Sequence, residues 1–222
     1  MELPKLNASL ECLTKSDGSA KLSINENEQL CAIYGPGEVK IAKELADRAY
    51  LNITYKPRIG QISNQEKVIE YSIKSICDGS ILTTMHPRTS INIILQEVQT
   101  TTDENNQQNQ NRLACAINCV CLALLDASIP LKFSFASVCC SLTKTQDIIY
   151  FPTGKQQQDK NTLLTATFVF DSVENDLIFV NTNGIFEINN FNYLLLKAKD
   201  YCVNHLFTYF NKCISNKLEN LF

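Results

Sequence analysis

The sequence predicts an α+β protein made of two strand-rich halves, each backed by helices. Short apolar or alternating runs, typical of strands, occur in both halves, and longer stretches with helical spacing of apolar residues lie between them. The order is strands, helix and strand, then helix, strands and helix, which is typical of α+β architecture. With 222 residues, 45% of them hydrophobic and 19% charged, the chain is long enough for a single domain over residues 1–222 with a sizeable core.

The first sixty residues are expected to form a meander of strands joined by turns. The runs LECLT, AKLSI and QLCAIY are apolar or alternating, and the turn-like segments KSDGS and NENE separate them. YGPGEVK then interrupts the strands, because Gly35 and Gly37 flank Pro36 and allow a sharp turn or a close approach of another chain. YLNITYKP has apolar residues at every second position, so it predicts a half-buried strand that Pro57 ends.

A helix is predicted over residues 64–83, followed by a strand and a polar loop. Ser63 or Asn64 is suited to cap the first turn, and apolar residues recur after them near helical spacing. HPRTSINIILQEVQ, residues 86–99, predicts a strand because it is rich in β-branched residues. TTTDENNQQNQN, residues 100–111, is too hydrophilic to pack and is expected to be a mobile loop.

The second half begins with a helix over residues 113–127 that is apolar on almost every side, which predicts burial. Four strand-like runs follow Pro130, namely LKFSFASVCCSL, DIIYF, LLTATFVFD and DLIFVNT. A long helix over residues 190–216 ends the chain. Its inner side is predicted to carry Tyr193, Leu194, Ala198, Tyr201, Cys202, His205, Leu206 and Tyr209.

The charge of the chain disfavours a free-standing nucleic-acid-binding protein. The net charge is −3, whereas such proteins usually carry a strongly basic surface. Only four of the basic residues are arginines: Arg48, Arg58, Arg88 and Arg112. Arginine is the residue best suited to bidentate recognition of phosphate, so its scarcity limits phosphate chemistry.

Location is suggested by the absence of targeting signals. No apolar run approaches the roughly 20 residues needed to span a bilayer. The start, MELPKLNASLECL, lacks the basic and apolar regions of a signal peptide. We therefore expect an intracellular protein without a membrane partner, whose ten cysteines stay as thiols.

Three cysteines in the helix over residues 113–127 raise the question of a metal site or a nucleophile. Cys115, Cys119 and Cys121 give the spacings C-x-x-x-C and C-x-C, whereas structural zinc sites use pairs such as C-x-x-C near a second pair. No histidine lies nearby in the sequence. Because thiols also behave as small hydrophobic groups, core packing is favoured and no metal ligands are expected.

Other catalytic arrangements are weakly supported. His86 and His205 favour structural roles, and no G-x-S-x-G elbow or glycine-rich phosphate loop is present. Asp147 and Asp159 are isolated from other carboxylates, so general acid–base chemistry has few candidates.

One basic segment leaves two interpretations open. YKPRIGQISNQEK places Lys56, Arg58 and Lys67 around a loop that precedes a helix. The segment is either an ordinary solvated loop or a modest phosphate-facing patch that gains importance when partners complete a basic surface.

Several motifs resemble those of the RNase PH family. SDGSAKLSI and QLCAIYGPGEVK are similar to the family's opening strands, MHPRTSINIILQEVQ to its R-[ST]-x-I strand, and ACAINCVCLALLDASIPL to its alanine-rich helix. FDSV and TNGIF fit its final strands. The resemblance covers nearly the whole chain and, through LTTMHPRTSI, PTGKQ and FDSVENDL, extends to ring subunits of the eukaryotic RNA exosome. It implies the RNase PH fold (ribosomal protein S5 domain 2-like), with two β-α-β-like halves in one domain.

The chain departs from the family where active members bind phosphate and metal. Those enzymes degrade RNA from its 3′ end by phosphorolysis, and a D-G-G-[ST]-R turn before the alanine-rich helix holds phosphate. Gln110 and Asn111 stand at the glycines of that turn, and Arg112 is one residue out of register with its arginine. The residues at the positions of the family's arginines and carboxylates are Ser75, Leu113, Phe151, Gln156 and Gln157.

The resemblance therefore implies a non-catalytic structural subunit of the exosome ring, which supports 3′-to-5′ RNA processing and degradation, including rRNA maturation. It implies a hetero-hexamer with other RNase PH-like subunits, RNA-binding cap subunits, RNA and a separate nuclease as partners, and no cofactor. It also implies a location in the nucleus, nucleolus and cytoplasm. The alternative is an active phosphorolytic or hydrolytic 3′ exonuclease acting as a homo-oligomer.

Two sets of residues are predicted to carry this role, and no catalytic residue is expected. RNA contact is assigned to Arg58, Lys67 and Arg112, because the equivalent loops of the family face the channel. The residues assigned to an interface or to the fold itself are Gly35, Pro36, Gly37 and Glu38.

Overall fold

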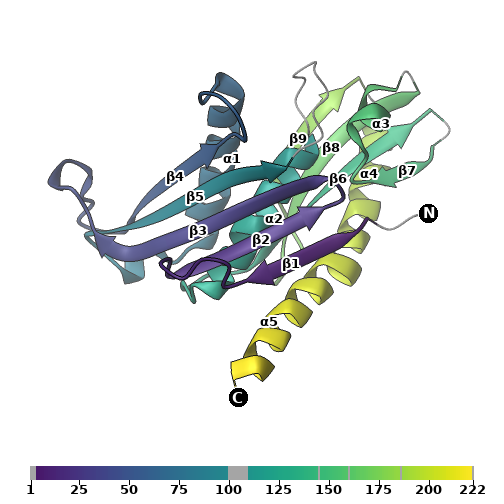
Figure 1. Cartoon of the computed structure of the whole chain (residues 1–222). Coiled ribbons are helices and arrows are strands. Elements are labelled where there is room, and N and C mark those ends of the chain that lie inside the picture. Colours follow the sequence, from purple (N-terminus) through teal and green to yellow (C-terminus); the bar gives the residue numbers. More distant parts are fainter. Residues whose placement is uncertain (1–3, 100–109, 145, 160, 186, 222) are drawn as a thin grey trace.

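Two β-sheets with a helix buried between them form the framework of the chain (Figure 1). The computed structural model describes residues 4–99, 110–144, 146–159, 161–185 and 187–221. The larger sheet has five strands in the order β1-β2-β3-β5-β4, and the smaller has four in the order β7-β6-β8-β9. The predicted α+β class, with two strand-rich halves, is confirmed.

The larger sheet contains a meander and one parallel pair. Its strands are β1 (Leu6–Leu10), β2 (Gly18–Ile24), β3 (Asn27–Glu38), β4 (Tyr50–Lys56) and β5 (Thr89–Gln99). β4 and β5 run parallel, which requires a crossover, and helix α1 supplies it. The first strand was predicted at LECLT and lies earlier, because Glu11 has a φ of 54° and leaves the extended conformation.

Helix α1 (Asn64–Ser80) begins with a capping box and packs on the larger sheet. The Ser63 side chain accepts from the main-chain N–H of Gln65, and the Glu66 carboxylate accepts from the N–H of Ser63. Of the two predicted caps, Ser63 is therefore confirmed. The helix ends earlier than predicted because Ile81 is extended.

Helix α2 (Gln110–Asp126) is buried along most of its length between the two sheets. One side packs on β2 and β3 and the other on β6 and β8. Asn118 is buried at the second interface, where its amide donates to the Ser137 carbonyl at 2.8 Å and accepts from the Ser137 N–H at 2.7 Å. The helix includes Gln110 and Asn111, which were expected in the polar loop; residues 100–109 of that predicted loop lie outside the described residues.

The three cysteines of α2 are fully buried, so the prediction of core packing is confirmed. The thiols of Cys115 and Cys119 donate to main-chain carbonyls of β2 and β3 at 3.3 to 3.6 Å. Burial raises the pKa of the Cys121 thiol to about 12, and it raises the pKa values of Cys115 and Cys119 as well. These thiols are therefore protonated near neutral pH and poor as ligands or nucleophiles.

The smaller sheet is antiparallel throughout. Its strands are β6 (Phe135–Thr143), β7 (Ile148–Tyr150), β8 (Thr162–Asp171) and β9 (Leu177–Gly184). The short helix α3 (Gly154–Gln158), which was not predicted, lies between β7 and β8. Its first turn is capped by Thr153, whose N–H donates to the Gln156 side chain at 2.9 Å.

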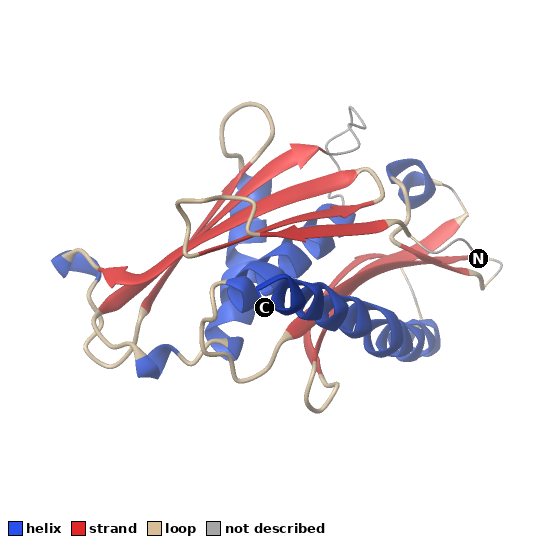
Figure 2. Cartoon of the chain, turned by 60° about the horizontal axis from the view of Figure 1, so that its bottom comes forward, coloured by secondary structure: helices blue, strands red, loops and turns tan. Residues whose placement is uncertain are grey.

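The C-terminal helix is continuous but changes its winding. Its parts are α4 (Ile188–Tyr201), a π-helical segment (Cys202–Leu206) and α5 (Phe207–Leu221). α4 packs on β6 and β8, the inner strands of the smaller sheet, and α5 contacts β1, an edge strand of the larger sheet (Figure 2). Leu194, Ala198 and Leu206 are buried as predicted. Tyr193 and His205 are exposed, which contradicts their predicted inner positions; the wider π turn rotates the residues around His205 away from the 3.6-residue pattern.

The D-G-S-A motif (Asp17 to Ala20) connects the larger sheet to the end of α2 and, through Asp126, to α5. A Cβ on Gly18 would lie 2.4 Å from the main-chain nitrogen of Ala127, so only glycine allows this approach of β2 to the end of α2. The Ser19 N–H donates to the buried carboxylate of Asp126 at 2.8 Å, and Lys217 of α5 pairs with the same carboxylate at 2.8 Å.

Candidate functional site

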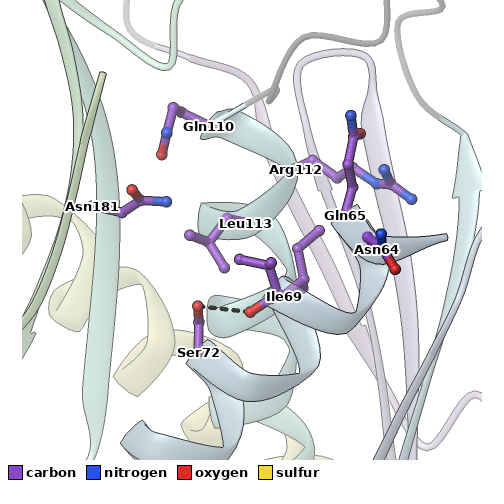
Figure 3. A pocket seen from close by; sticks show the side chains of 9 residues that line it. Asn64, Gln65, Ile69, Ser72, Gln110, Arg112, Leu113 and Asn181 are labelled. Carbon is purple, nitrogen blue, oxygen red and sulfur yellow. Dashed lines mark hydrogen bonds between the residues drawn. The ribbon is translucent and has the colours of Figure 1, made fainter. Parts of the chain in front are cut away.

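A cavity of about 250 Å³ lies between the first turns of α1 and α2 and strand β9 (Figure 3). It therefore sits where the two halves of the chain meet. Its lining residues are Asn64, Gln65, Val68, Ile69, Ser72, Gln110, Arg112, Leu113 and Asn181. Most of them are apolar or carry neutral amides.

The cavity includes two of the positions at which the resemblance places phosphate-binding groups in active relatives. Leu113, at the position of the turn arginine, contributes an aliphatic wall. Gln110, at one of the glycines, lies at the start of α2 and is buried, with 2% of the residue exposed. A phosphate placed here would meet a leucine and an amide instead of a guanidinium and open main chain.

The other departures lie away from this cavity. Ser75 is exposed on α1 and does not line it. Phe151 is buried in the core against Tyr201, with ring centroids 6.3 Å apart. The Gln156 side chain accepts from the N–H of Thr153, and Gln157 donates to the Pro152 carbonyl at 3.1 Å, so both stabilise the turn around α3.

Arg112 is held by two carboxylates and a tyrosine. Its Nη2 lies 2.9 Å from Glu66 Oε1, and its Nε lies 2.8 Å from Glu97 Oε1. The same Nε donates to the Tyr55 hydroxyl at 2.9 Å, and the guanidinium carbon lies 5.0 Å from the centre of the tyrosine ring. Only 15% of the Arg112 side chain is exposed. We call Tyr55, Glu66, Glu97 and Arg112 the arginine cluster.

Two negative charges face one positive charge in the arginine cluster. Burial raises the pKa of Tyr55, so its hydroxyl stays protonated. Burial pushes the pKa of Glu66 upward, but hydrogen bonds from Ser63 and Arg112 outweigh that effect and hold the pKa below its ordinary value. The carboxylate is thus ionised near neutral pH and compensates the charge of Arg112.

The remaining predicted RNA contacts are exposed. Arg58 lies in the loop after β4, and its main-chain N–H donates to Glu97 Oε2 at 3.2 Å, which fastens this loop to the arginine cluster. Lys67 is exposed on the first turn of α1. The structure thus brings Arg58, Lys67 and Arg112 around the first turn of α1, and their contact with RNA stays a prediction.

The glycine-proline signature forms an irregular end of β3. Gly35 has a φ of 123°, and a Cβ there would lie 2.5 Å from the Ser90 carbonyl oxygen, so the position requires glycine. Its N–H donates to Asp17 at 2.7 Å, which links it to the D-G-S-A motif. Pro36, Gly37 and Glu38 are exposed. Gly35 therefore serves the fold, and the assignment of the three exposed residues to an interface stays a prediction.

The described part of the chain contains neither a cluster of metal ligands nor a helix suited to span a membrane. Nowhere among those residues do three His, Cys, Asp or Glu side chains gather as metal ligands would. Among the described helices, none is both long enough and apolar enough to cross a bilayer.

The sequence and fold of this chain match known proteins. The sequence model described as RNase PH, 3′ exoribonuclease family, domain 1, matches residues 2–130, which is more than half of the chain. The chain belongs to the RNase PH family. The crystal structure of rice (Oryza sativa) Rrp46 superposes on it with a TM-score of 0.81 and 27% identity, covering 95% of this chain and 96% of the rice chain. The expected RNase PH fold is therefore confirmed.

Named relatives of this RNase PH-family chain are exosome proteins. It is 28% identical to the Arabidopsis thaliana "Exosome complex exonuclease RRP46 homolog" over 86% of this chain and 82% of the relative. It is also 28% identical to the Saccharomyces cerevisiae "Exosome complex component RRP46" over 89% and 90% of the two chains. The predicted resemblance to exosome ring subunits is confirmed. The fold also matches an Archaeoglobus fulgidus exosome subunit, with a TM-score of 0.72 and 14% identity over 94% of this chain and 89% of that chain.

Sequence reasoning missed the partners of Arg112. Glu66 had a readable signal, because it stands three residues after Ser63, the spacing of a capping box. Glu97 interrupts the apolar face of a strand, and such a buried carboxylate requires a partner. Tyr55 was identified only as an alternating apolar residue, and its hydroxyl role depends on contacts between distant segments.

Proposed function

We propose that this chain is a non-catalytic structural subunit of the RNA exosome ring. Its role is to supply interfaces to neighbouring RNase PH-like subunits and to form part of the RNA channel, so that it supports 3′-to-5′ processing and degradation, including rRNA maturation. The names of its relatives and its fold support the ring role.

The state of Arg112 carries the non-catalytic part of the proposal. Phosphorolysis needs preorganised positive charge where the transferring phosphate develops negative charge. Arg112 alone is charged among the described residues that line the cavity, and Glu66 and Glu97 already pair with it. A phosphate approaching Arg112 would have to displace a carboxylate and would be repelled by the second one.

Partners and location follow from the same proposal. The chain would assemble with other ring subunits into a hetero-hexamer and contact RNA-binding cap subunits. Exposed groups such as Arg58 and Lys67 would contact RNA on its way to a separate nuclease. A location in nucleus, nucleolus and cytoplasm fits this work. Fluorescent tagging of the endogenous chain would test the location, and a tag confined to another compartment would contradict it.

The test of activity is a phosphorolysis assay on the purified chain. Single-stranded RNA is incubated with the chain and Mg²⁺, with and without inorganic phosphate, beside an active RNase PH enzyme as a control. We expect no phosphate-dependent release of nucleoside diphosphates. Release of diphosphates would overturn the non-catalytic assignment and favour the alternative, an active 3′ exonuclease, which the word "exonuclease" in the name of the Arabidopsis relative keeps worth testing.

The ring role has a separate test. Affinity purification of the tagged chain from its own cells is expected to recover other RNase PH-like subunits in equal amounts. Recovery of the chain alone, as a monomer or homo-oligomer, would contradict the ring role whatever the assay of activity shows.

A further inference from the structure

Gln110 holds a buried hydrogen-bond donor without a partner beside the cavity. Its residue exposure is 2%, and its Oε1 accepts from the Thr167 hydroxyl at 2.9 Å. Among the described residues, nothing accepts from its Nε2. A buried polar group that lacks a partner raises the free energy of the fold, so a ligand that supplies one binds with a gain.

The amide of Gln110 has two useful orientations. As described, its amino group is the unsatisfied one. Turned over, the amino group would donate to the Thr167 hydroxyl, which can then donate to the Gln110 main-chain carbonyl 3.3 Å away. The carbonyl oxygen would then be the atom without a partner. Gln110 can therefore present either a donor or an acceptor to a ligand.

The rest of the lining selects the class of ligand. Val68, Ile69 and Leu113 form aliphatic walls that favour an apolar face. Figure 3 shows Gln110 and Asn181 on one side of the cavity, while the guanidinium of Arg112 points toward the opposite side. Because Arg112 is paired with Glu66 and Glu97, the described residues that line the cavity offer aliphatic and amide surface, and none of them carries an uncompensated positive charge.

We propose that this cavity binds an uncharged nucleobase and excludes phosphate. The aliphatic side chains would contact the faces of the ring, and the carboxamides of Gln110 and Asn181 would bond to its edge, since carboxamides pair with base edges through a donor and an acceptor together. The volume agrees with this class. A cavity of about 150 Å³ holds benzene, whereas pockets for larger ligands occupy about 300–1,000 Å³. At about 250 Å³, this one suits a heterocyclic base.

The base has two possible sources, a free nucleoside or a base splayed out of an RNA strand. The chemistry of recognition is the same for both. The proposal does not depend on membership of the ring, because every residue that carries it belongs to this chain.

The test measures binding of adenosine, uridine, a short single-stranded RNA and inorganic phosphate to the full-length chain by isothermal titration calorimetry. We expect saturable binding of at least one nucleoside and none of phosphate. Gln110→Leu should weaken nucleoside binding roughly tenfold, the loss expected for one hydrogen bond of about 1.4 kcal/mol. Asn181→Ala, at a half-buried position on β9, should weaken it similarly and serves if Gln110→Leu does not fold.

A matched control separates ligand contact from structural damage. Asn183→Ala changes the same residue type on β9 outside the cavity. This variant should bind nucleoside as the unchanged chain does. Absence of nucleoside binding at millimolar concentration, binding of phosphate in competition with nucleoside, or equal losses in test and control variants would overturn the proposal.

The RNA arm identifies the source of the base. If a base of RNA enters the cavity, Gln110→Leu and Asn181→Ala weaken RNA binding as they weaken nucleoside binding. If the ligand is a free nucleoside, RNA binding does not respond to these variants. Recovery of the chain with ring subunits tests the proposed function separately, so the two failures can be told apart.

Discussion

Arg112 shows how neighbouring side chains decide what a charged residue does. In the sequence it stands one residue before Leu113, the position at which the resemblance places a phosphate-binding arginine. Nothing in the sequence shows that its charge is paired. In the folded chain, Glu66 from α1 and Glu97 from β5 pair with it, and Tyr55 from β4 covers one face. Four side chains from α2, α1 and two strands thus form the arginine cluster beside the cavity, and Arg112, Glu66 and Glu97 carry its charges.

Removal of the guanidinium should therefore cost stability. Arg112→Met leaves two carboxylates buried without their counter-charge, which typically lowers the free energy of unfolding by about 3–5 kcal/mol. Urea denaturation of the purified chain measures this loss. The control is Arg48→Met, which breaks a surface pair between neighbouring residues and should change stability by less than about 1 kcal/mol. Equal effects of the two substitutions would show that the arginine cluster contributes no more than a surface pair.

Part of this cluster could be predicted from the sequence. The S-x-x-E spacing of Ser63 and Glu66 signals a helix start, and the apolar character of α2 signals burial. The pairing of Arg112 with Glu97 could not be predicted, because it depends on how the folded chain places α2 against β5. The expected loss of phosphate-binding groups rests on the resemblance alone.

At the scale of elements, the approach of β2 to the end of α2 limits what the chain tolerates. Gly18→Ala would place a Cβ 2.4 Å from the main chain of Ala127, so β2 and α2 must separate. We expect a loss of about 2 kcal/mol or more, as for other overpacked sites. Gly79→Ala is the control, since nothing lies within 4 Å of its added Cβ and helix propensity should raise stability by about 0.5–1 kcal/mol. Thermal and urea denaturation measure both, and a neutral Gly18→Ala would contradict the close packing.

The elements differ in how well the sequence predicted them. Strands with strong alternation and the apolar helix α2 were predicted within a few residues, because periodicity reports burial directly. Helix α3 is too short to show a period. In the C-terminal helix, the π-helical segment breaks the 3.6-residue repeat, so a pattern extended through it assigned His205 to the wrong side.

Across the molecule, α5 joins the C-terminal part of the chain to the region of β1 and to the end of α2. Lys217 pairs with Asp126 at 2.8 Å and Glu11 at 2.9 Å, and the Tyr209 hydroxyl accepts from the Ala8 N–H at 2.8 Å. Lys217→Met removes the partner of a carboxylate that is 3% exposed, so we expect a loss of about 1–3 kcal/mol. Limited proteolysis should then cut α5 sooner. Lys212→Met, at an exposed position of the same helix, should leave the rate of cleavage unchanged, and equal cleavage of both variants would contradict the tie.

The burial of α2 between two sheets has a consequence for synthesis on the ribosome. The larger sheet and α2 are complete before β6 has been translated, and the side of α2 that carries Ala114, Asn118 and Cys121 then has nothing to pack on. The nascent chain therefore leaves this side of α2 exposed until β6 and β8 emerge, and chaperones bind chains in which apolar surface is exposed in this way. The family match that ends at residue 130 marks a stretch of sequence, whereas the unit that folds must include the strands that close over this helix.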